Sequence, residues 1–378
     1  AGMAAASAVS PLEAAGAGPS PRHGLTCAAL CTPDRSYLYV FGGIRPHGTV
    51  EAGNKYHDDL HVLDWGSKAW KQIPPRGDFW PQGRAFHSAT AIDSRAFLVF
   101  GGATGAAPAA SAGLEPSDAA AAAGETRGGP GPSKHTRASQ HRLPTGPDAL
   151  AAHGTEAEAP EAAMLSFLND VWLFKSDQRQ WVPVICHGTP PSPRAAHAAT
   201  LVPAPARLLV HGGSGPDNGT RKDIWLLAVS SCTWSRLRFP PATGPSARCY
   251  HTASCVDGHV FVFGGRSKMS VACDATMHVL DVSAAEWDAV PPAARNSPAA
   301  RNSPAARNSP AARNSPSAGR SSHSAVVCGR AVLLFGGRPP DGDASVGKGK
   351  RTGTMLAFDT AERAWMPVPD LAAGAGAA

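Results

Sequence analysis

Short apolar runs recur along this chain, and each one ends in a pair of glycines. They are YLYVFGG (37–43), FLVFGG (97–102), LLVHGG (208–213), VFVFGG (260–265) and VLLFGG (332–337). A run of this length that is almost wholly apolar predicts a β-strand buried on both faces. Glycine adopts positive φ and lacks a side chain, so each pair predicts a turn with close packing. The pairs are Gly42 and Gly43, Gly101 and Gly102, Gly212 and Gly213, Gly264 and Gly265, and Gly336 and Gly337.

Two further signals keep a fixed order around each glycine pair. An Arg-x-x-His unit and a stretch of small residues precede the apolar run, and an apolar alternation ending at a Trp follows the glycines. The paired residues are Arg84 and His87, Arg194 and His197, Arg248 and His251, and Arg320 and His323, whereas Arg22 of the first copy is followed by Leu25. The tryptophans are Trp70, Trp181, Trp234, Trp287 and Trp365. Each unit predicts four strands, which in the second copy are HSATAI, FLVFGG, DVWLF and WVPVI.

The spacing of the units supports a repeat architecture. The second glycines stand at 43, 102, 213, 265 and 337, and the period is about 50 residues once two inserted stretches are set aside. The arrangement resembles the kelch repeat over residues 22–102 and 164–369. This resemblance implies an all-β, kelch-type β-propeller with five recognisable four-stranded blades. They fall at about 22–73, 84–186, 194–238, 248–290 and 320–369; a ring of six, with one blade degenerate or missing, is the alternative.

The N-terminal segment, residues 1–21, is interpreted as a partial blade or a closing strand. Its stretch SAVSPLEAAGAGPSPR (7–22) resembles WVPVICHGTPPSPR (181–194), which is the last strand of the second unit and the loop after it. We predict five blades whose closure this segment assists. Residues 370–378 are predicted to form a flexible tail.

The repeated Arg and His residues have a structural and a catalytic interpretation. A His near a channel could act as a general base. A residue that recurs in four or five blades, however, fits a role in every blade better than a role in one site. We therefore expect these side chains to hydrogen-bond loop carbonyls and to hold the blades in register, and we expect each Trp to fill the wide rim between blades.

The long connections all fall at one end of the predicted blades. In an antiparallel blade, the loops after strands two and four leave from the same end, and here these loops are the long ones. This loop-rich face carries many basic residues, and loops on a rigid scaffold commonly bind partners. They are Arg45, Lys55, Arg221, Lys222, Arg266, Lys268, Arg338, Lys348, Lys350 and Arg351. We hypothesise a protein partner with an acidic or phosphorylated segment; ordinary solvated surface charge is the alternative.

Two low-complexity insertions belong to that face. The tract at 103–163 is rich in Ala, Gly and Pro, nearly free of aromatic residues, and predicted to be disordered. The hexapeptide array at 292–316 places Ser-Pro at Ser297, Ser303, Ser309 and Ser315, each with an Arg two residues earlier. These serines are candidate sites of proline-directed phosphorylation, which would add negative charge to a basic face. The alternative is an inert loop from a slipped DNA repeat.

The amino-acid composition limits the fold class, the cellular location and the cofactors that we expect. The chain has 378 residues, a net charge of +6, 40 glycines and 35 prolines, too many Gly and Pro for a helical protein. It shows no signal peptide and no apolar run of membrane-spanning length, so we expect an intracellular, cytoplasmic protein. The eight cysteines show no CxxC pair, so we expect reduced thiols and neither a metal nor a cofactor.

We interpret the chain as a non-catalytic, monomeric protein–protein interaction scaffold. A purely architectural propeller within a longer polypeptide is a second possibility. The enzyme alternative is a kelch module of a tRNA-modifying or acyl-CoA-binding enzyme whose catalytic part lies elsewhere. Resemblance to copper-radical oxidases is poor because only four tyrosines are present, and the iron ligand set of kelch-like specifier proteins is missing. Nucleic-acid binding is permitted by the charge but lacks aromatic-basic interleaving on an exposed strand.

Overall fold

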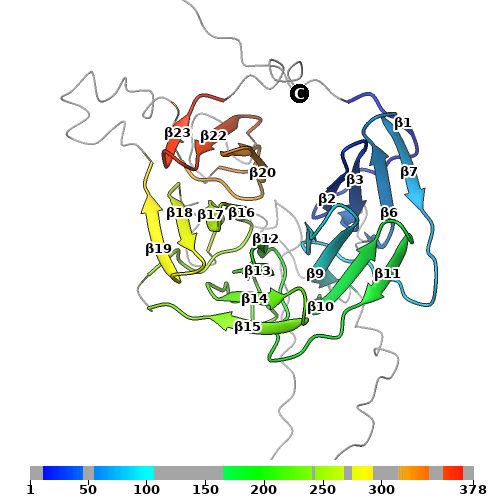
Figure 1. Cartoon of the computed structure of the whole chain (residues 1–378), viewed down its shortest axis with the longest axis horizontal. Coiled ribbons are helices and arrows are strands. Elements are labelled where there is room, and N and C mark those ends of the chain that lie inside the picture. The colour runs from blue at the N-terminus through cyan, green and yellow to red at the C-terminus, as the bar shows by residue number, and fades with distance from the viewer. Residues whose placement is uncertain are drawn as a thin grey trace, which may run out of the picture.

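The structure is a computed structural model of the whole chain, and it describes residues 12–45, 55–105, 165–240, 243–267, 275–292, 314, 316, 318–339 and 352–368. Five sheets are arranged around a common axis, and each contains four strands that pair antiparallel with their neighbours (Figure 1). The prediction of an all-β, five-bladed kelch-type propeller is confirmed. We number the blades 1 to 5 in chain order.

Each blade is built in one pass, from an inner first strand to an outer fourth strand. Blade 1 has β2 (Thr26–Cys31), β3 (Ser36–Phe41), β6 (Leu60–Asp64) and β7 (Ala69–Ile73). Blade 2 has β8 (Ser88–Ala91), β9 (Ala96–Thr104), β10 (Ser166–Lys175) and β11 (Gln180–Pro183). Blade 3 has β12 (Ala198–Pro203), β13 (Ala206–His211), β14 (Ile224–Ala228) and β15 (Thr233–Leu237). Blade 4 has β16 (Thr252–Val256), β17 (His259–Phe263), β18 (Met277–Asp281) and β19 (Glu286–Val290). Blade 5 has β20 (Ser324–Cys328), β21 (Ala331–Phe335), β22 (Met355–Asp359) and β23 (Ala364–Met366).

The hydrophobic core is divided into layers between successive blades. One layer joins Leu30 and Phe41 of blade 1 to Phe97, Phe174 and Trp181 of blade 2. Equivalent layers join blades 2 and 3, blades 3 and 4, and blades 4 and 5. In blades 2, 3 and 4 the second strand packs on the preceding blade through one face and on the following blade through the other. This explains the uniformly apolar runs of the sequence.

The first strands surround the axis, and their small residues fit the narrow end of each blade. β2, β8, β12, β16 and β20 pack in sequence, each against its successor. β20 and β2 lack the close packing that joins the other four pairs, and Figure 1 shows the two blades apart on that side. The ring of five blades is therefore open between blade 5 and blade 1.

The described part of the N-terminal segment pairs with the outer edge of blade 1. A short strand, β1 (Ala15–Gly16), pairs in parallel with the outer strand β7, with Ala15 opposite Ala69 and Gly16 opposite Trp70. His187 makes the same parallel pairing with Thr233, just before Trp234. Ala15 thus stands where a chain leaves the outer strand of a preceding blade, which gives the resemblance between 7–22 and 181–194 a structural counterpart.

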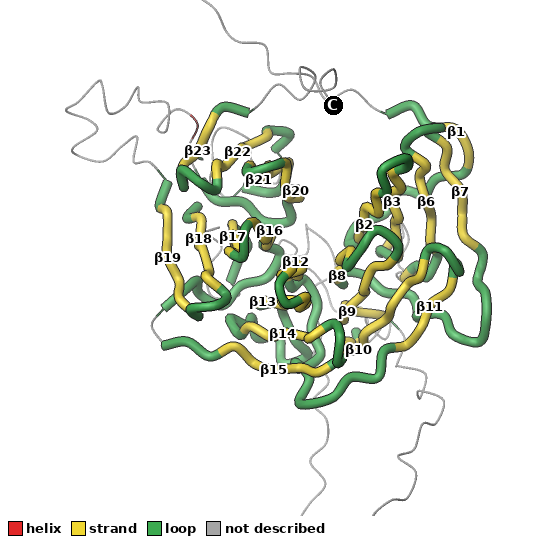
Figure 2. Tube along the Cα trace, in the orientation of Figure 1, coloured by secondary structure: helices red, strands yellow, loops and turns green. Residues whose placement is uncertain are grey.

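Long and short connections segregate to opposite ends of the blades. Figure 2 shows the strands of the five blades and the described loops that join them. Short turns such as 257–258 and 329–330 join strands one and two. At the other end, β4 (Ile44–Arg45) and β5 (Lys55–Tyr56) form a two-stranded ribbon after the first glycine pair. Most of the tract at 103–163, nearly all of the array at 292–316 and the tail at 370–378 lie outside the described residues.

Candidate partner-binding face

Each blade is entered through an arginine that is buried beside the glycine pair. Arg84 is fully buried, and its guanidinium donates two bonds of 2.8 Å to the Asp170 carboxylate and one of 3.1 Å to the Gly101 carbonyl. Arg194 repeats this with Asp223 and Gly212. Arg248 and Arg320 also bond the carbonyl of their blade's first glycine. The arginine therefore ties the blade entrance to the end of the second strand.

The carboxylates that pair with these arginines were not singled out by the sequence analysis. They are Asp59, Asp170 and Asp223, each the residue just before or within the third strand, and Thr354 takes their place in blade 5. Burial opposes ionisation of Asp223, but the bonds from Arg194 and Trp225 outweigh it and hold the pKa of that carboxyl below its ordinary value. The recurrent Asp-x-Trp of blades 2 and 3 is the sequence signal that could have revealed these carboxylates.

The glycine pair is required by the approach of the next blade. Gly264 has φ +68°, and a Cβ built on it would lie 2.2 Å from the Arg320 carbonyl oxygen. The next residue, Gly265, donates its N–H to that same carbonyl at 2.9 Å. Any side chain here would collide with the neighbouring backbone.

The repeated histidines hold adjacent blades together, but through hydroxyls and not through the loop carbonyls that we expected. His87 Nε2 bonds Thr26 Oγ1 at 2.7 Å, His197 Nε2 bonds Ser88 Oγ at 3.0 Å, and His323 Nε2 bonds Thr252 Oγ1 at 2.9 Å. In each case the hydroxyl begins the first strand of the preceding blade. Blade 3 has an alanine there, so His251 Nε2 bonds Nδ1 of His211 at 2.8 Å.

These histidines are held in the neutral form. Burial lowers the pKa of His197, His211 and His323 to about 3, with a further contribution from the adjacent arginines. Burial lowers the pKa of His87 and His251 well below the ordinary value as well. Their side chains are buried between blades, which fits a role in blade contacts.

The tryptophans of the fourth strands cover the ring that ends the preceding blade's second strand. Trp181 lies 5.0 Å from Phe41, Trp234 5.3 Å from Phe100 and Trp365 5.2 Å from Phe263, between ring centroids. Trp287 packs on His211 at 6.0 Å. Trp70 lies instead against Gly18 of the N-terminal segment.

The basic residues of the loop-rich face are only partly within the described chain. Arg45 is exposed at the end of β4, and Lys55 stands opposite it in β5. Arg221 is paired with Asp217 at 3.0 Å, and Lys222 follows it. Arg266 and Arg338 follow the fourth and fifth glycine pairs. Lys268, Lys348, Lys350, Arg351, Ser297, Ser303, Ser309 and Ser315 lie outside the described residues.

Aromatic side chains gather at the same end, around the entrances of the blades. Phe86 and Tyr250 are each the third residue of an Arg-x-x-His unit, and their rings meet edge to face at 5.6 Å. His23 lies 5.8 Å from Phe86, and the Arg266 guanidinium lies 4.9 Å above the Tyr250 ring. Burial raises the pKa of the nearby Tyr56 to about 12, with a contribution from Tyr250. We call His23, Tyr56, Phe86, Tyr250 and Arg266 the mouth cluster.

The mouth cluster was missed because its members are far apart in the sequence. The sequence analysis singles out only Arg266 among them, and Phe86 and Tyr250 occupy a variable position of the Arg-x-x-His unit. The sequence does carry one signal for Phe86 and Tyr250. Both side chains are large, whereas the same position holds glycine, alanine and serine in the other copies. All are partly exposed. A positive charge over an aromatic face, beside further aromatic rings, is a surface suited to binding.

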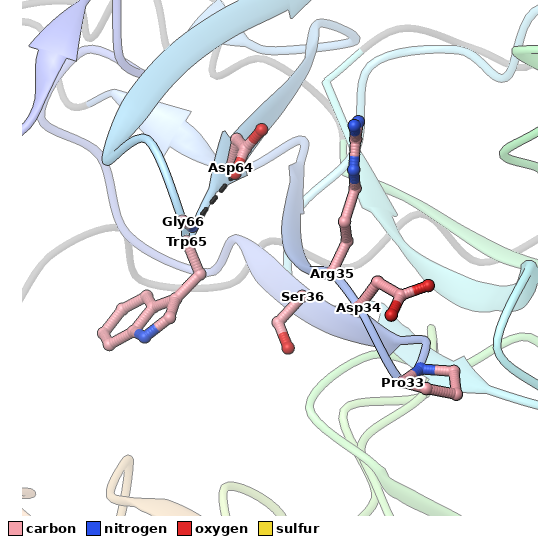
Figure 3. Close-up of a pocket in the computed structure, with 7 residues that line it drawn as sticks. All are labelled: Pro33, Asp34, Arg35, Ser36, Asp64, Trp65 and Gly66. Carbon is pink, nitrogen blue, oxygen red and sulfur yellow. Dashed lines mark hydrogen bonds between the residues drawn. The ribbon is translucent and has the colours of Figure 1, made fainter.

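The opposite end of blade 1 carries a shallow depression. Its lining residues are Pro33, Asp34, Arg35, Ser36, Asp64, Trp65 and Gly66 (Figure 3). The Gly66 N–H donates to Asp64 at 2.9 Å, while Trp65 and Arg35 point in different directions. The described residues contain neither a group of three His, Cys, Asp or Glu side chains placed to hold a metal ion nor a helix long and apolar enough to cross a membrane.

Comparison with known proteins places the fold in a family. The sequence profile of the KLHDC2/KLHL20/DRC7 Kelch-repeats domain matches residues 4–110 and 154–309. The chain is 27% identical over 279 residues to Host cell factor of Drosophila melanogaster, covering 67% of this chain and 14% of that protein. It is 25% identical over 301 residues to human Host cell factor 1, covering 72% of this chain and 14% of the relative.

A third relative is the mouse Kelch domain-containing protein 1, at 24% identity over 263 residues, covering 65% of this chain and 48% of its own length. The chain thus spans a minor part of these relatives. Kelch propellers are typical of protein-interaction scaffolds and are generally non-catalytic. On its five repeats, its blade geometry and this match, the chain belongs to the KLHDC2/KLHL20/DRC7 kelch-repeat family.

Proposed function

We propose that this chain is a non-catalytic interaction domain that binds a protein partner through its loop-rich face, centred on the mouth cluster. The observation that carries the proposal is the contact of Tyr250 with the edge-to-face ring of Phe86 and with the Arg266 guanidinium above its own ring. Aromatic and arginine side chains dominate the binding energy of protein interfaces. The repeated histidines bond across the blade junctions, so in this proposal they stabilise the fold and do not contact the partner.

The partner is proposed to present an acidic or phosphorylated segment. Arg45 and Arg266 are exposed at this end, and both are guanidinium groups that can make paired bonds to carboxylate or phosphate. Phosphorylation of Ser297, Ser303, Ser309 or Ser315 would place negative charge at the same end. In that state we expect the array to compete with the acidic partner.

The test is binding to an immobilised array of acidic and phosphoserine peptides, each beside a copy with Asn and Gln in place of Asp and Glu. One variant reverses the charges of Arg266, Lys268, Lys348, Lys350 and Arg351. The matched control reverses five exposed basic residues away from the loop-rich end: Arg35, Lys68, Lys71, Arg95 and Arg179. We expect the first variant to lose the acidic peptides and the control to keep them. Equal retention by both variants would refute the acidic-partner proposal.

A second variant tests the mouth cluster separately from charge. Phe86→Ala removes the ring that packs on Tyr250 and leaves the net charge unchanged. We expect weaker binding with an unchanged salt dependence, because salt screens the charges and not the aromatic contact. Far-ultraviolet circular dichroism and the thermal midpoint control for folding. Unchanged affinity would place the binding site away from the cluster.

A further inference from the structure

The loop that leaves blade 2 crosses to the outer edge of blade 3 before the chain enters that blade. His187 in this loop pairs in parallel with Thr233, at the start of β15. The His187 N–H donates to the Cys232 carbonyl at 2.8 Å, and the Trp234 N–H donates to the His187 carbonyl at 2.9 Å. A Cβ built on Gly188 would lie 2.7 Å from the Trp234 carbonyl oxygen, so the two backbones stay close after the pairing. The loop is therefore fixed to β15 at this point.

Cysteines precede both members of this pairing. Cys186 comes directly before His187, and Cys232 comes directly before Thr233. They are thus neighbours across a parallel pairing, in which adjacent backbones lie about 5 Å apart. A disulfide spans Cα separations of about 4.4–6.8 Å. Both thiols are free and half-buried, so the pairing places two unbonded cysteines at the spacing that a disulfide requires.

The two sulfur atoms have weak partners in the reduced state. The Cys186 thiol packs against the core between blades 2 and 3 and donates to the Val184 carbonyl at 3.7 Å. The Cys232 thiol donates to the Val229 carbonyl at 3.9 Å. Burial raises the pKa of the Cys186 thiol to about 11, and the nearby Cys232 thiol contributes to this shift. Thiols are weak donors, so a bond between the sulfurs would give up little.

The fold itself does not require cysteine at either position. The N-terminal segment makes the same crossing onto blade 1, where Ala15 pairs with Ala69 and donates its N–H to the Lys68 carbonyl at 2.9 Å. There the two cysteine positions hold Ala14 and Lys68. The turn position that Cys232 occupies has positive φ in all five blades, and the other blades hold Lys68, Arg179, Ala285 and Arg363 there. Two cysteines at one crossing therefore have a chemical rather than a conformational explanation.

The remaining described cysteines have no cysteine opposite them in the backbone pairing. Their cross-strand partners are Val40, Ser36, Arg266, Val260 and Ala331. These cysteines are Cys27, Cys31, Cys249, Cys255 and Cys328. Within the described part of the chain, the crossing between blades 2 and 3 is thus the place where the backbone brings two thiols together.

We propose that Cys186 and Cys232 form a reversible oxidation site, at which a peroxide converts the two thiols into a disulfide between the exit loop of blade 2 and the outer edge of blade 3. One thiolate attacks hydrogen peroxide; the O–O bond breaks, an S–O bond forms, and the released hydroxide takes up a proton to give water. The second thiol then attacks the sulfenic sulfur. The S–S bond forms, the S–O bond breaks, and the hydroxyl leaves with a proton as a second water. The two electrons lost by the sulfurs are those that the peroxide gains.

Cys232 reacts first in this scheme. It lies in a turn at the surface, whereas the Cys186 thiol is packed against the core and kept protonated by its raised pKa. Cys186 therefore acts as the resolving thiol, and disulfide formation should accelerate as the pH rises towards the pKa of this group. The proposal does not depend on the function of the loop-rich face.

The disulfide would make one anchor of the exit loop covalent. The loop has a second anchor at Pro191, whose carbonyl accepts from Asn169 Nδ2 at 3.2 Å. At the first anchor the amides of His187 and Trp234 carry the backbone bonds between the loop and β15. We expect hydrogen exchange at these two amides to slow by about tenfold on oxidation, because the disulfide opposes local opening. The disulfide also constrains the unfolded chain, so we expect the thermal midpoint to rise.

The test maps the thiols after mild oxidation. The reduced 378-residue protein is treated with hydrogen peroxide, the remaining thiols are blocked with iodoacetamide, and the protein is digested without reductant for mass spectrometry. We expect a peptide pair joined through Cys186 and Cys232, which dithiothreitol returns to two free thiols. The rate of its formation is measured between pH 7 and pH 9.

Single substitutions separate the two roles. In Cys186→Ser the Cys232 sulfur should stop at the sulfenic acid, which dimedone traps, because the resolving thiol is missing. In Cys232→Ser the Cys186 thiol should stay reduced for at least about tenfold longer than in the natural protein. Cys255→Ser removes another half-buried cysteine and is the matched control; it should leave the rate of disulfide formation unchanged.

A designed pair tests the register independently of the natural cysteines. Ala14→Cys with Lys68→Cys places two thiols at the equivalent crossing onto blade 1, and we expect peroxide to join them as well. A folded protein whose Cys186 and Cys232 remain separate thiols or sulfenic acids would overturn the proposal, whether or not the designed pair forms. Faster formation of a disulfide between other cysteines would overturn it too. A Cys186–Cys232 disulfide that dithiothreitol does not reduce would refute the reversible site.

Discussion

Acidification should weaken this propeller well above the pH at which carboxylates titrate. Five histidines are buried between blades, and burial lowers the pKa of three of them, His197, His211 and His323, to about 3. An unfolded chain binds a proton on each histidine near pH 6.5. Between these values the unfolded state holds more protons, so stability is complete above about pH 6.5 and falls as the pH decreases.

The size of this loss of stability follows from the difference between the histidine pKa in the folded and the unfolded state. At pH 5 each neutral histidine costs about 2 kcal/mol of folding free energy, since one pH unit below 6.5 is worth about 1.4 kcal/mol. The three residues with a pKa of about 3 would together cost about 6 kcal/mol, which is a large part of the whole stability of a domain, and the lowered pKa of His87 and His251 acts in the same direction. We expect the guanidinium midpoint, followed by tryptophan fluorescence, to fall steeply between pH 7 and pH 5.

A variant of the junction between blades 3 and 4 can test this with one titrating histidine fewer. Ala198→Ser with His211→Phe gives it the hydroxyl and the aromatic ring that the other junctions have, so His251 would bond the introduced hydroxyl in place of His211. We expect the stability lost between pH 7 and pH 5 to be about 2 kcal/mol smaller than in the natural protein. His259→Gln, at the start of β17 where the side chain is 37% exposed, is the control and should change this loss far less, because its pair with Asp281 is open to solvent. Equal stability of the natural protein at pH 5 and pH 7 would refute the reasoning, as would identical pH dependence of the double variant.

Three further predictions concern a buried ring, a backbone approach and a buried charge pair. Trp181→Ala should cost about 3–5 kcal/mol because the ring is fully buried among aromatic residues, while Trp65→Ala, at a site 55% exposed, should cost less than about 0.5 kcal/mol; denaturant titration compares them. Gly264→Ala should destabilise the chain by several times the roughly 1–2 kcal/mol of left-handed strain expected for Gly336→Ala, and equal thermal shifts would contradict the clash with Arg320. Asp223→Asn should cost about 3–5 kcal/mol by leaving the buried Arg194 without its counter-ion, and a loss below about 1 kcal/mol would show that the carbonyl bonds alone hold the arginine.

The sequence by itself determined the repeating unit and what each of its positions requires. Strand two of every blade is readable as an apolar run, and in blades 2, 3 and 4 the reason is that a strand with a blade on each side has no polar face. The glycine pairs, the arginines and the rim tryptophans are readable because each blade repeats the same contacts. Such regularities are local in the chain and recur, so five copies support one another.

Only the tertiary structure decided which residues from different blades meet. The Asp170 carboxylate that neutralises Arg84 is 86 positions away, and the Ser88 hydroxyl that bonds His197 is 109 positions away. The mouth cluster likewise joins loops from separate blades, and no periodic pattern marks it. The opening of the ring depends on how far each blade rotates about the axis, which is set by packing between blades. A sequence pattern specifies which side chains a blade presents on each face. Only the assembled ring shows which of these faces is covered by a neighbouring blade.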